Sequence, residues 1–354
     1  MSQAVLSTPA RATPPPVPSN AAGRRFVGGM RQIALVPVIG VLIVIGTLIN
    51  PSFLSFNNFT EIGEFSSALG ITVVGESLVL LTGGMDLSLE STYGLAPMVA
   101  AWTILSRNSF GAGLMLSPYL ALVVLLAVGA AVGMTNGLLI VKGRLNGFIV
   151  TLAMTILLYG LQDGIVSDQS LFNLPSAFTY LGAAYLFRSS NSGLGGIPVS
   201  LVFTVAVFIV VGLFLRYHRA GRAIYAVGGN REAALAAGIK VNRVRIGVYV
   251  AAGVLAAIGG LMEAGQTSSV STLQGYSEGI IFPVFAAAVI GGVSLRGGRG
   301  NMVGAATGVI LLGIVTNILN ISQVSNYWIF AVQGAVILAA LVLARIIGGR
   351  AGVE

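Results

Sequence analysis

Long apolar runs separated by short polar segments extend along almost the whole chain. Ten such runs can be drawn, and most approach the roughly 20 residues that an α-helix needs to span a bilayer. They cover about residues 33–49, 65–82, 90–106, 116–140, 147–166, 198–216, 245–265, 279–295, 302–319 and 326–346. The pattern predicts an all-α, polytopic membrane protein of about ten transmembrane helices, with nine or eleven as alternatives and an interfacial helix around 172–187.

Polar sequence at both ends frames one membrane domain. Residues 1–30 contain three consecutive prolines and too little apolar surface to fold, so a disordered, Pro-rich leader is expected there. The run at 33–49 exceeds a typical signal-peptide core, and Asn50-Pro51 follows it where a cleavage site would have small residues. It is therefore the expected first span of a transmembrane domain over 31–347, which a short tail over 348–354 follows.

Lysine and arginine residues collect in alternating loops, and this predicts the orientation of the chain. If ten spans start from a cytoplasmic N-terminus, all nineteen basic residues except Arg107 and Arg188 face the cytoplasm. Short cytoplasmic loops of membrane proteins carry an excess of Lys and Arg. Both termini, with the leader and the tail, are therefore expected to be cytoplasmic.

Composition supports the membrane assignment and excludes other classes. Hydrophobic residues make up 55% of the chain and charged residues only 8%, against about 25% charged in soluble proteins. The net charge of +8 lies in short loops, whereas nucleic-acid binding requires a basic face on a soluble module. With no cysteine and one histidine, disulfides, thiolate metal sites and histidine zinc clusters are excluded.

Catalytic motifs are also absent from the sequence. A P-loop ends in Gly-Lys-Ser/Thr, whereas the only lysines, Lys142 and Lys240, follow valine and isoleucine. A single histidine excludes a His-Glu-x-x-His zinc site and leaves no serine with the partners of a histidine-based triad. We expect no enzymatic activity, no cofactor and no metal in this chain.

The largest predicted cytoplasmic loop, residues 217–243, contains signals for a short capped helix. Asn230 suits the N-cap of a helix over Arg231–Ala237, and Gly238 suits its C-cap. A solvated connector is one interpretation of this loop. A docking helix for a cytoplasmic partner explains better why small and apolar residues are expected to face water there, namely Ala233, Ala234, Leu235, Ala236 and Ile239.

A glycine pair interrupts the apolar pattern between the second and third runs. Gly83-Gly84 predicts a helix break, because glycine costs about 1 kcal/mol in a helix interior. Asp86, Ser88 and Glu90 follow at every second residue. Two interpretations stay open: a polar cytoplasmic turn with Asp86 as the N-cap of the next helix, or direct contact with a transported solute.

A similar segment lies near the end of the chain. Gly291-Gly292 again ends an apolar run, and Ser294 follows at the spacing of Asp86 after the first pair. Glycine-interrupted segments in the two halves of a transporter often mark its pathway, although Gly297–Gly300 also suits a flexible cytoplasmic turn.

Other polar residues lie within the apolar runs. Asn136, Thr151 and Thr155 suit hydrogen bonds between helices, each contributing about 1 kcal/mol. Glu76 and Glu263 are candidates because carboxylates inside a membrane are generally functional. The residues that we place along a candidate translocation path are Asp86, Ser88, Glu90, Asn136, Thr151 and Ser294.

Four of these segments together resemble the permease subunits of ribose-type sugar ABC importers. They are Gly-Gly-Met-Asp-Leu-Ser at 83–88, Phe-Ile-Val-Thr-Leu at 148–152, the loop at 221–239 and Gly-Gly-Val-Ser-Leu-Arg-Gly-Gly-Arg-Gly at 291–300. Their order and spacing match over about residues 35–345, and the leader falls outside the match. Glu90 departs from the pattern, since relatives usually have glycine there, and with Tyr93 and Pro97 it puts in doubt which solute passes.

The resemblance implies a permease of the bacterial inner membrane that works as a homodimer or with a related permease. A tandem-domain ATPase that binds Mg-ATP would drive it, and a periplasmic or lipid-anchored binding protein would deliver a pentose, hexose or polyol. Residues 230–239 would then be the coupling helix, with Asn230, Arg231, Glu232, Ala233, Ala234, Leu235, Ala236, Gly238 and Ile239 at the ATPase. The alternative is a proton-coupled secondary transporter with Asp86, Glu76 or Glu263 as its relay.

Overall fold

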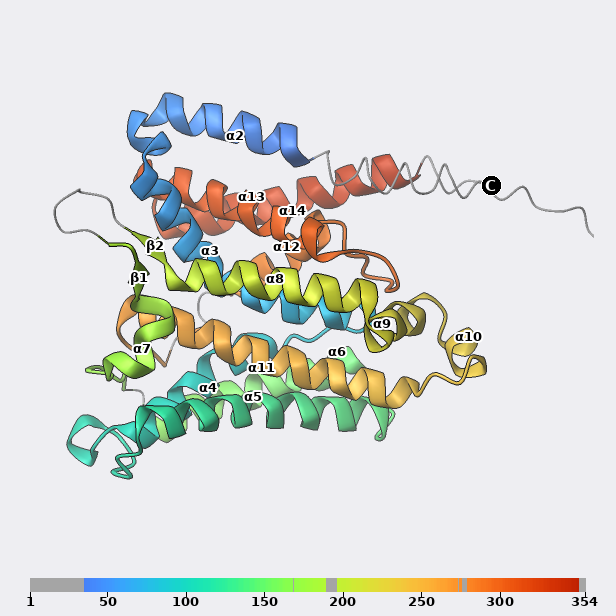
Figure 1. Ribbon diagram of the computed structural model, residues 1–354, viewed down its shortest axis with the longest axis horizontal. Helices are drawn as coiled ribbons and strands as arrows, with labels where there is room; N and C mark the ends of the chain where they lie inside the picture. The colour runs from blue at the N-terminus through green and yellow to red at the C-terminus, as the bar shows by residue number, and fades with distance from the viewer. Residues whose placement is uncertain (1–34, 168, 189–195, 273, 276–278, 350–354) are drawn as a thin grey trace, which may run out of the picture.

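The computed structural model describes residues 35–167, 169–188, 196–272, 274–275 and 279–349 (Figure 1). The predicted leader and residues 350–354 of the predicted tail lie outside this part. The helices are α2 (Leu35–Ile49), α3 (Phe56–Leu81), α4 (Leu89–Ile104), α5 (Pro118–Val141), α6 (Gly147–Val166), α7 (Ser176–Ala183), α8 (Val199–Tyr217), α9 (Arg219–Gly229), α10 (Arg231–Ala236), α11 (Val241–Thr267), α12 (Ile281–Ile290), α13 (Met302–Ile321) and α14 (Asn326–Gly349).

Short elements complete the described chain. Two 3-10 turns, η1 (Pro51–Leu54) and η2 (Arg107–Ser109), follow α2 and α4. Strands β1 (Tyr185–Leu186) and β2 (Ile197–Pro198) pair antiparallel between α7 and α8. The all-α prediction is therefore confirmed, and α7 lies inside the stretch predicted as an extra helix at 172–187.

Each of the ten predicted apolar runs coincides with a helix. Six of the described helices, α3, α5, α6, α8, α11 and α13, are long and apolar enough to cross a membrane. By contrast, α2, α4 and α12 have 15, 16 and 10 residues, fewer than the roughly 20 that a span requires. The polytopic class is confirmed, and the count of ten spans stays a prediction.

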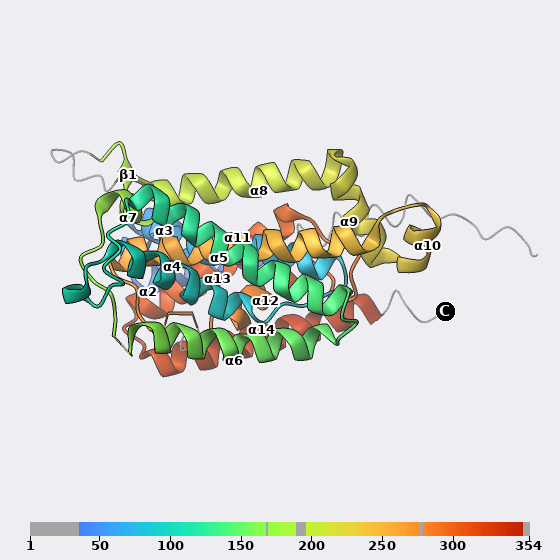
Figure 2. The same cartoon turned by 90° about the horizontal axis from the view of Figure 1, so that it is seen from below.

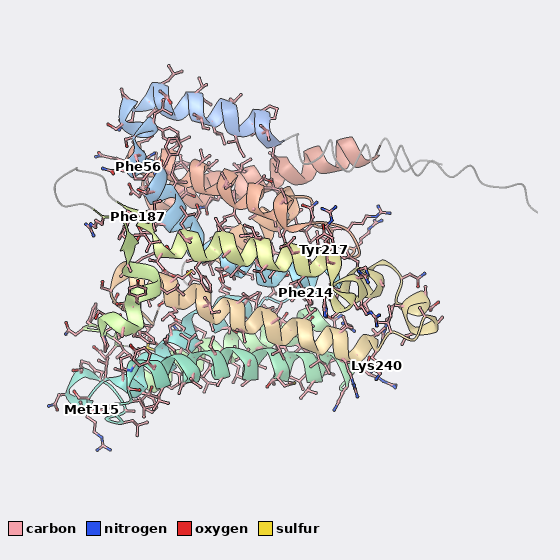
Figure 3. The ribbon with its side chains drawn as sticks, in the orientation of Figure 1. Phe56, Met115, Phe187, Phe214, Tyr217 and Lys240 are labelled. Atoms are coloured by element: carbon pink, nitrogen blue, oxygen red, sulfur yellow. The ribbon has the colours of Figure 1, made fainter. Side chains whose placement is uncertain are left out.

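Most of the long helices run along the long axis of the molecule, so that their connections gather at its two ends. Figure 2 shows α8 on one face of the bundle and α6 and α14 on the opposite face, with α11 between them. Figure 3 places Tyr217 and Lys240 at the end that holds α9 and α10, and Met115 and Phe187 at the other. We call these the basic end and the opposite end.

Helix α11 is the centre of the bundle, and glycine lets its neighbours approach closely. A Cβ on Gly253 would lie 2.2 Å from the carbonyl oxygen of Gly129 in α5, and one on Gly260 would lie 1.8 Å from that of Tyr93 in α4. Small residues at such crossings are typical of membrane helices, where packing has to replace the hydrophobic effect. Abundant glycine in this sequence therefore reflects tight helix packing.

The interior and the periphery are both apolar. Val73, Leu80 and Leu312 are buried in the main core, whereas Ile149 and Val210 are among many large apolar side chains left exposed on the outer helices. A soluble protein rarely exposes apolar surface on this scale. The exposed side chains suit contact with lipid tails.

Candidate functional site

The loop at the basic end forms the capped helix that its sequence predicts. Helix α10 starts at Arg231, and the side-chain oxygen of Asn230 accepts a hydrogen bond from the backbone N–H of Ala233 at 2.9 Å. Gly238 follows with a φ of +77°, a left-handed conformation that favours glycine after a helix. The helix ends at Ala236, one residue before the predicted end.

One prediction about the faces of α10 is wrong. Ala234 was expected to face water, but it is only 3% exposed and packs between Val227 of α9 and Val241 of α11. Leu235 is 54% exposed. Helical geometry turns adjacent side chains to different faces, so Ala234 anchors α10 while Leu235 is presented outward. Ala233 and Ala236 are exposed, and Ile239 is half-buried.

Helix α9 connects this loop to the interior of the bundle. A Cβ on Gly228 would lie 1.9 Å from the carbonyl oxygen of Leu81 and 2.7 Å from the backbone nitrogen of Gly298. The Tyr225 hydroxyl donates a hydrogen bond to the carbonyl of Gly300 at 2.8 Å, and burial raises its pKa, so it stays a donor. The end of α9 therefore sits directly on two turns.

These turns are the two glycine-broken segments that the sequence singles out, and the structure brings them together. The backbone N–H of Gly298 donates to the carbonyl of Leu81 at 2.9 Å. Gly83 and Gly292 have φ of +76° and +87°, so each break contains a glycine in the left-handed conformation. Gly84 and Gly291, the other members of the pairs, lie at the ends of α3 and α12 without positive φ.

A buried polar cluster follows the first break. Asp86 accepts hydrogen bonds from the backbone N–H of Ser88 at 3.0 Å and from its hydroxyl at 2.6 Å. Asn136 of α5 donates to the Ser88 hydroxyl at 2.7 Å, and the carboxylate of Glu76 accepts from the backbone N–H of Asp86 at 3.4 Å. These four side chains are fully buried, so the cluster ties the turn to α3 and α5.

Other predicted residues take positions that differ from the expectation. Asp86 is not the N-cap of α4, because that helix begins at Leu89 with Ser88 at the N-cap position and Asp86 accepts hydrogen bonds from Ser88 just before it. The hydroxyls of Thr151 and Thr155 were expected to bond between helices, but each donates to a carbonyl one turn back in α6. Ser294 accepts from the backbone N–H of Arg296 inside its own turn.

The carboxylate of Glu90 has a structural role at the start of α12. It accepts the backbone N–H of Ile281, the first residue of α12. A carboxylate at a helix N-terminus satisfies a free N–H group and interacts favourably with the helix dipole. Glu90 therefore joins α4 to α12.

A cavity that these residues do not line is a further candidate for the solute path. It has a volume of about 480 Å³ and lies between α3, α4, α11, α12, α13 and α14 toward the opposite end. We call it the membrane cavity. It is lined by Phe65, Ala68, Leu69, Tyr93, Glu263, Gln266, Thr267, Ile280, Pro283, Leu312, Gly313, Thr316, Asn320, Ile329, Phe330 and Gln333.

The lining combines apolar walls with uncharged polar groups. Gln333 of α14 donates to the Thr316 hydroxyl of α13 at 3.2 Å, and Gln266 of α11 donates to the carbonyl of Glu64 at 2.7 Å. Among the described residues that line the cavity, Glu263 is the one carboxylic acid and none is Lys, Arg or His. Of these residues the sequence singled out Glu263, as a carboxylate within an apolar run, and Tyr93, as a residue that bears on which solute passes. Thr316, Asn320 and Gln333 carry no local signal, because they lie singly in apolar runs.

A hydrogen-bonded tyrosine lies just outside the cavity at the opposite end. The Tyr185 hydroxyl donates to the carboxylate of Glu64, the same residue whose backbone carbonyl accepts from Gln266. Burial, with this carboxylate, raises the pKa of Tyr185 to about 12. In the part of the chain that the structure describes, no group of three or more His, Cys, Asp or Glu residues is placed to hold a metal ion.

Comparisons with known proteins agree on one family. Residues 58–341 match the family model described as branched-chain amino acid transport system / permease component. The chain is 35% identical over 324 residues to the ribose import permease protein of Escherichia coli K12, covering 91% of this chain and 96% of that protein. No solved structure matches the chain.

Two further relatives match at similar length. The galactose/methyl galactoside import permease protein of Escherichia coli K12 is 31% identical over 329 residues, covering 90% of this chain and 96% of that protein. A probable ABC transporter permease protein of Sinorhizobium fredii is 32% identical over 322 residues, covering 91% of each.

Proposed function

The chain belongs to the branched-chain amino acid transport system / permease component family, and we propose that it is the permease subunit of an importer for a neutral sugar or related polyol. The family consists of permease components of ABC importers, which are not enzymes, and the chain is a multi-pass protein of the inner membrane. What carries the proposal is the match to ribose and galactose permeases along about nine-tenths of the chain.

The chemistry of the membrane cavity supports a neutral, hydroxylated solute. Small-molecule sites have volumes of about 300–1,000 Å³, and the cavity of about 480 Å³ falls in this range. Its amide and hydroxyl side chains, such as Gln333 and Thr316, can donate to and accept from sugar hydroxyls. An amino acid would bring a carboxylate into the cavity, and none of the described lining residues is a cation that could pair with it. We therefore favour a sugar over an amino acid.

The basic end supports contact with an ATPase in the cytoplasm. There α10 presents the exposed Leu235 while the buried Ala234 fastens the helix to α9 and α11. A displacement of α10 would pass through α9 to Gly228, which touches both glycine-broken turns. One of these turns leads into the polar cluster of Asp86.

The mechanism is a shift between two states of the bundle. Partners that bind the inward- and outward-facing states with different affinity move the equilibrium between them. A tandem-domain ATPase would supply this difference by binding and hydrolysing Mg-ATP. A periplasmic or lipid-anchored binding protein would deliver the solute, and a second permease, identical or related, would complete the membrane part.

Leu235→Asp tests this function, with Leu235→Met as the matched control. A carboxylate on the presented face removes apolar contact and places a charge at the interface. We expect the Asp variant to be folded in the membrane but to lose co-purification with the ATPase and ATP-dependent uptake of monosaccharide. The Met variant should retain both. Normal uptake by the Asp variant would show that α10 is not part of the coupling interface.

Solute class is tested separately in proteoliposomes that contain the complete transporter. Labelled ribose, galactose, a polyol and leucine are compared as solutes, each presented with the binding protein. Uptake of a sugar or polyol and none of leucine is expected. Uptake of leucine alone would replace the sugar assignment while leaving the permease assignment intact.

A further inference from the structure

A second cavity lies at the basic end, away from the membrane cavity. It has a volume of about 430 Å³ and is lined by Ile140, Val141, Arg144, Arg231, Asn242 and Arg245. Its walls come from the end of α5, the turn that joins α5 to α6, the first residue of α10 and the first turns of α11. We call it the arginine pocket.

The charge of the arginine pocket calls for an anion. Three of its six lining residues are arginines, one is an asparagine, and none is acidic. Like charges that share a cavity repel one another, and an anion between them converts this repulsion into attraction. The planar guanidinium group pairs bidentately with phosphate, so three arginines suit a phosphate group in particular.

The backbone holds one of these arginines in an unusual conformation. Arg144 has a φ of +56°, in the left-handed region that a non-glycine residue enters at a cost of about 1–2 kcal/mol. The surrounding turn, residues 142–146, joins two long apolar helices, α5 and α6. It places Arg144 in the pocket wall opposite elements that come from far along the chain.

The surroundings of the pocket place it where lipid headgroups lie. Leu139, Leu145, Phe148 and Ile149 are exposed apolar residues on and between the adjoining ends of α5 and α6. Ile140 and Val141 continue this apolar surface into the pocket wall. Acyl chains can cover the exposed side chains while a phosphate reaches the arginines, and basic pockets between membrane helices on the cytoplasmic side hold anionic headgroups in this way.

We propose that the arginine pocket binds the phosphate group of an anionic phospholipid of the inner leaflet. The proposal rests on the cytoplasmic placement of the basic end, which belongs to the proposed function, but not on the solute. Because Arg231 begins α10 while Arg144 and Arg245 belong to the bundle, the bound phosphate links the coupling helix to the membrane helices. Anionic lipid thereby stabilises the position of α10.

Lipid binding is measured by native mass spectrometry on the full chain, purified in detergent and titrated with phosphatidylglycerol, cardiolipin or phosphatidylcholine. The test variants are Arg144→Gln and the double variant Arg144→Gln/Arg245→Gln. Arg243→Gln is the control, because Arg243 is exposed on the same helix and does not line the pocket. Arg144→Gln leaves the contact of Arg245 with Tyr249 intact, whereas the double variant removes it. Comparing the two variants therefore shows whether loss of this contact causes a folding defect.

The expected result is tight binding of the two anionic lipids and none of phosphatidylcholine. Affinity should fall about fivefold in Arg144→Gln and about 25-fold in the double variant, with no change in Arg243→Gln. A rise in melting temperature with anionic lipid should be lost in parallel. Equal affinity of all variants would overturn the proposal.

Further arms distinguish other anions. If inorganic phosphate displaces the lipid only at millimolar or higher concentration, the lipid assignment stands. If inorganic phosphate binds and anionic lipid does not, the pocket takes a free anion and the lipid assignment is wrong. If neither binds but the double variant loses the ATPase, the arginines meet a carboxylate of the partner and the proposal also fails. In each negative case, normal uptake in phosphatidylcholine alone would leave the proposed function standing.

Discussion

The loop at the basic end and the membrane cavity are built in opposite ways. Helix α10 is specified by consecutive residues, with Asn230 at its start and Gly238 after its end. The membrane cavity takes its lining from six helices that lie far apart along the chain, for example Glu263 from α11 and Gln333 from α14. The difference teaches that the coupling element of this protein is local, whereas its solute path exists only after the bundle has packed.

The same difference predicts how the two regions respond to substitution. A substitution in the loop should affect uptake either through the contact with a partner or through the packing of α9 against the two glycine-broken turns. A change in the cavity should affect the solute and leave the ATPase bound. Changes in the buried polar cluster between them should affect stability.

The largest effect is expected from Gly228→Ala, with Gly229→Ala as the control. The added Cβ at Gly228 would lie 1.9 Å from a backbone oxygen, whereas one at Gly229 would meet nothing within 4 Å. Overpacking against backbone should cost about 3 kcal/mol and separate α9 from both turns. Gly228→Ala should lower the midpoint of thermal unfolding and abolish uptake, whereas Gly229→Ala should do neither. Wild-type behaviour of Gly228→Ala would show that α9 does not rest on these turns.

Asp86→Ala should destabilise the bundle by about 2 kcal/mol, because it leaves the buried N–H and hydroxyl of Ser88 without their acceptor. Denaturation in detergent measures this loss. Glu61→Ala, which removes an exposed carboxylate from α3, is the control and should unfold like the parent. A stable Asp86→Ala with lost uptake would instead place Asp86 on the solute path.

Glu263→Gln should lower sugar uptake about tenfold, since a hydrogen bond to a charged group contributes about 1.5–3 kcal/mol. Binding of the ATPase should be unaffected, because Glu263 lines the cavity toward the opposite end. Glu61→Gln serves as the matched control. Unchanged uptake by Glu263→Gln would exclude this carboxylate from solute contact.

The smallest effect is expected from Thr151→Val. The Thr151 hydroxyl is bonded to carbonyls of its own helix, which already have helical partners, so removing it should cost at most about 1 kcal/mol. Uptake and unfolding should resemble those of the parent chain. A large loss of uptake without a loss of stability would return Thr151 to the translocation path.

Much of the fold follows from sequence because periodicity and caps are local. The ten apolar runs became ten helices, and Gly83 and Gly292 became breaks because their left-handed backbone excludes most other residues. The burial of Ala234 was missed because an alanine carries no sign of which face its neighbours will cover. Its burial depends on Val227 and Val241, which come from other helices.

The site was only partly predictable for the same reason. Asp86, Ser88 and Glu90 form a visible polar pattern, and in the structure they hold turns and a helix end together. Thr316 and Gln333 stand alone in apolar sequence and become partners only when α13 meets α14. Polar residues isolated in predicted spans are therefore better candidates for the path than a conspicuous cluster at a break.

The central claim, that the loop at the basic end controls the membrane cavity, can be measured directly because the chain has no cysteine. Thr316→Cys places a single thiol in the cavity, and its rate of reaction with a maleimide is recorded in proteoliposomes. We predict that the cognate ATPase with ATP changes this rate and that Leu235→Asp, added to the same chain, abolishes the change. A rate that is the same with and without the ATPase, or a change that survives Leu235→Asp, would contradict the claim.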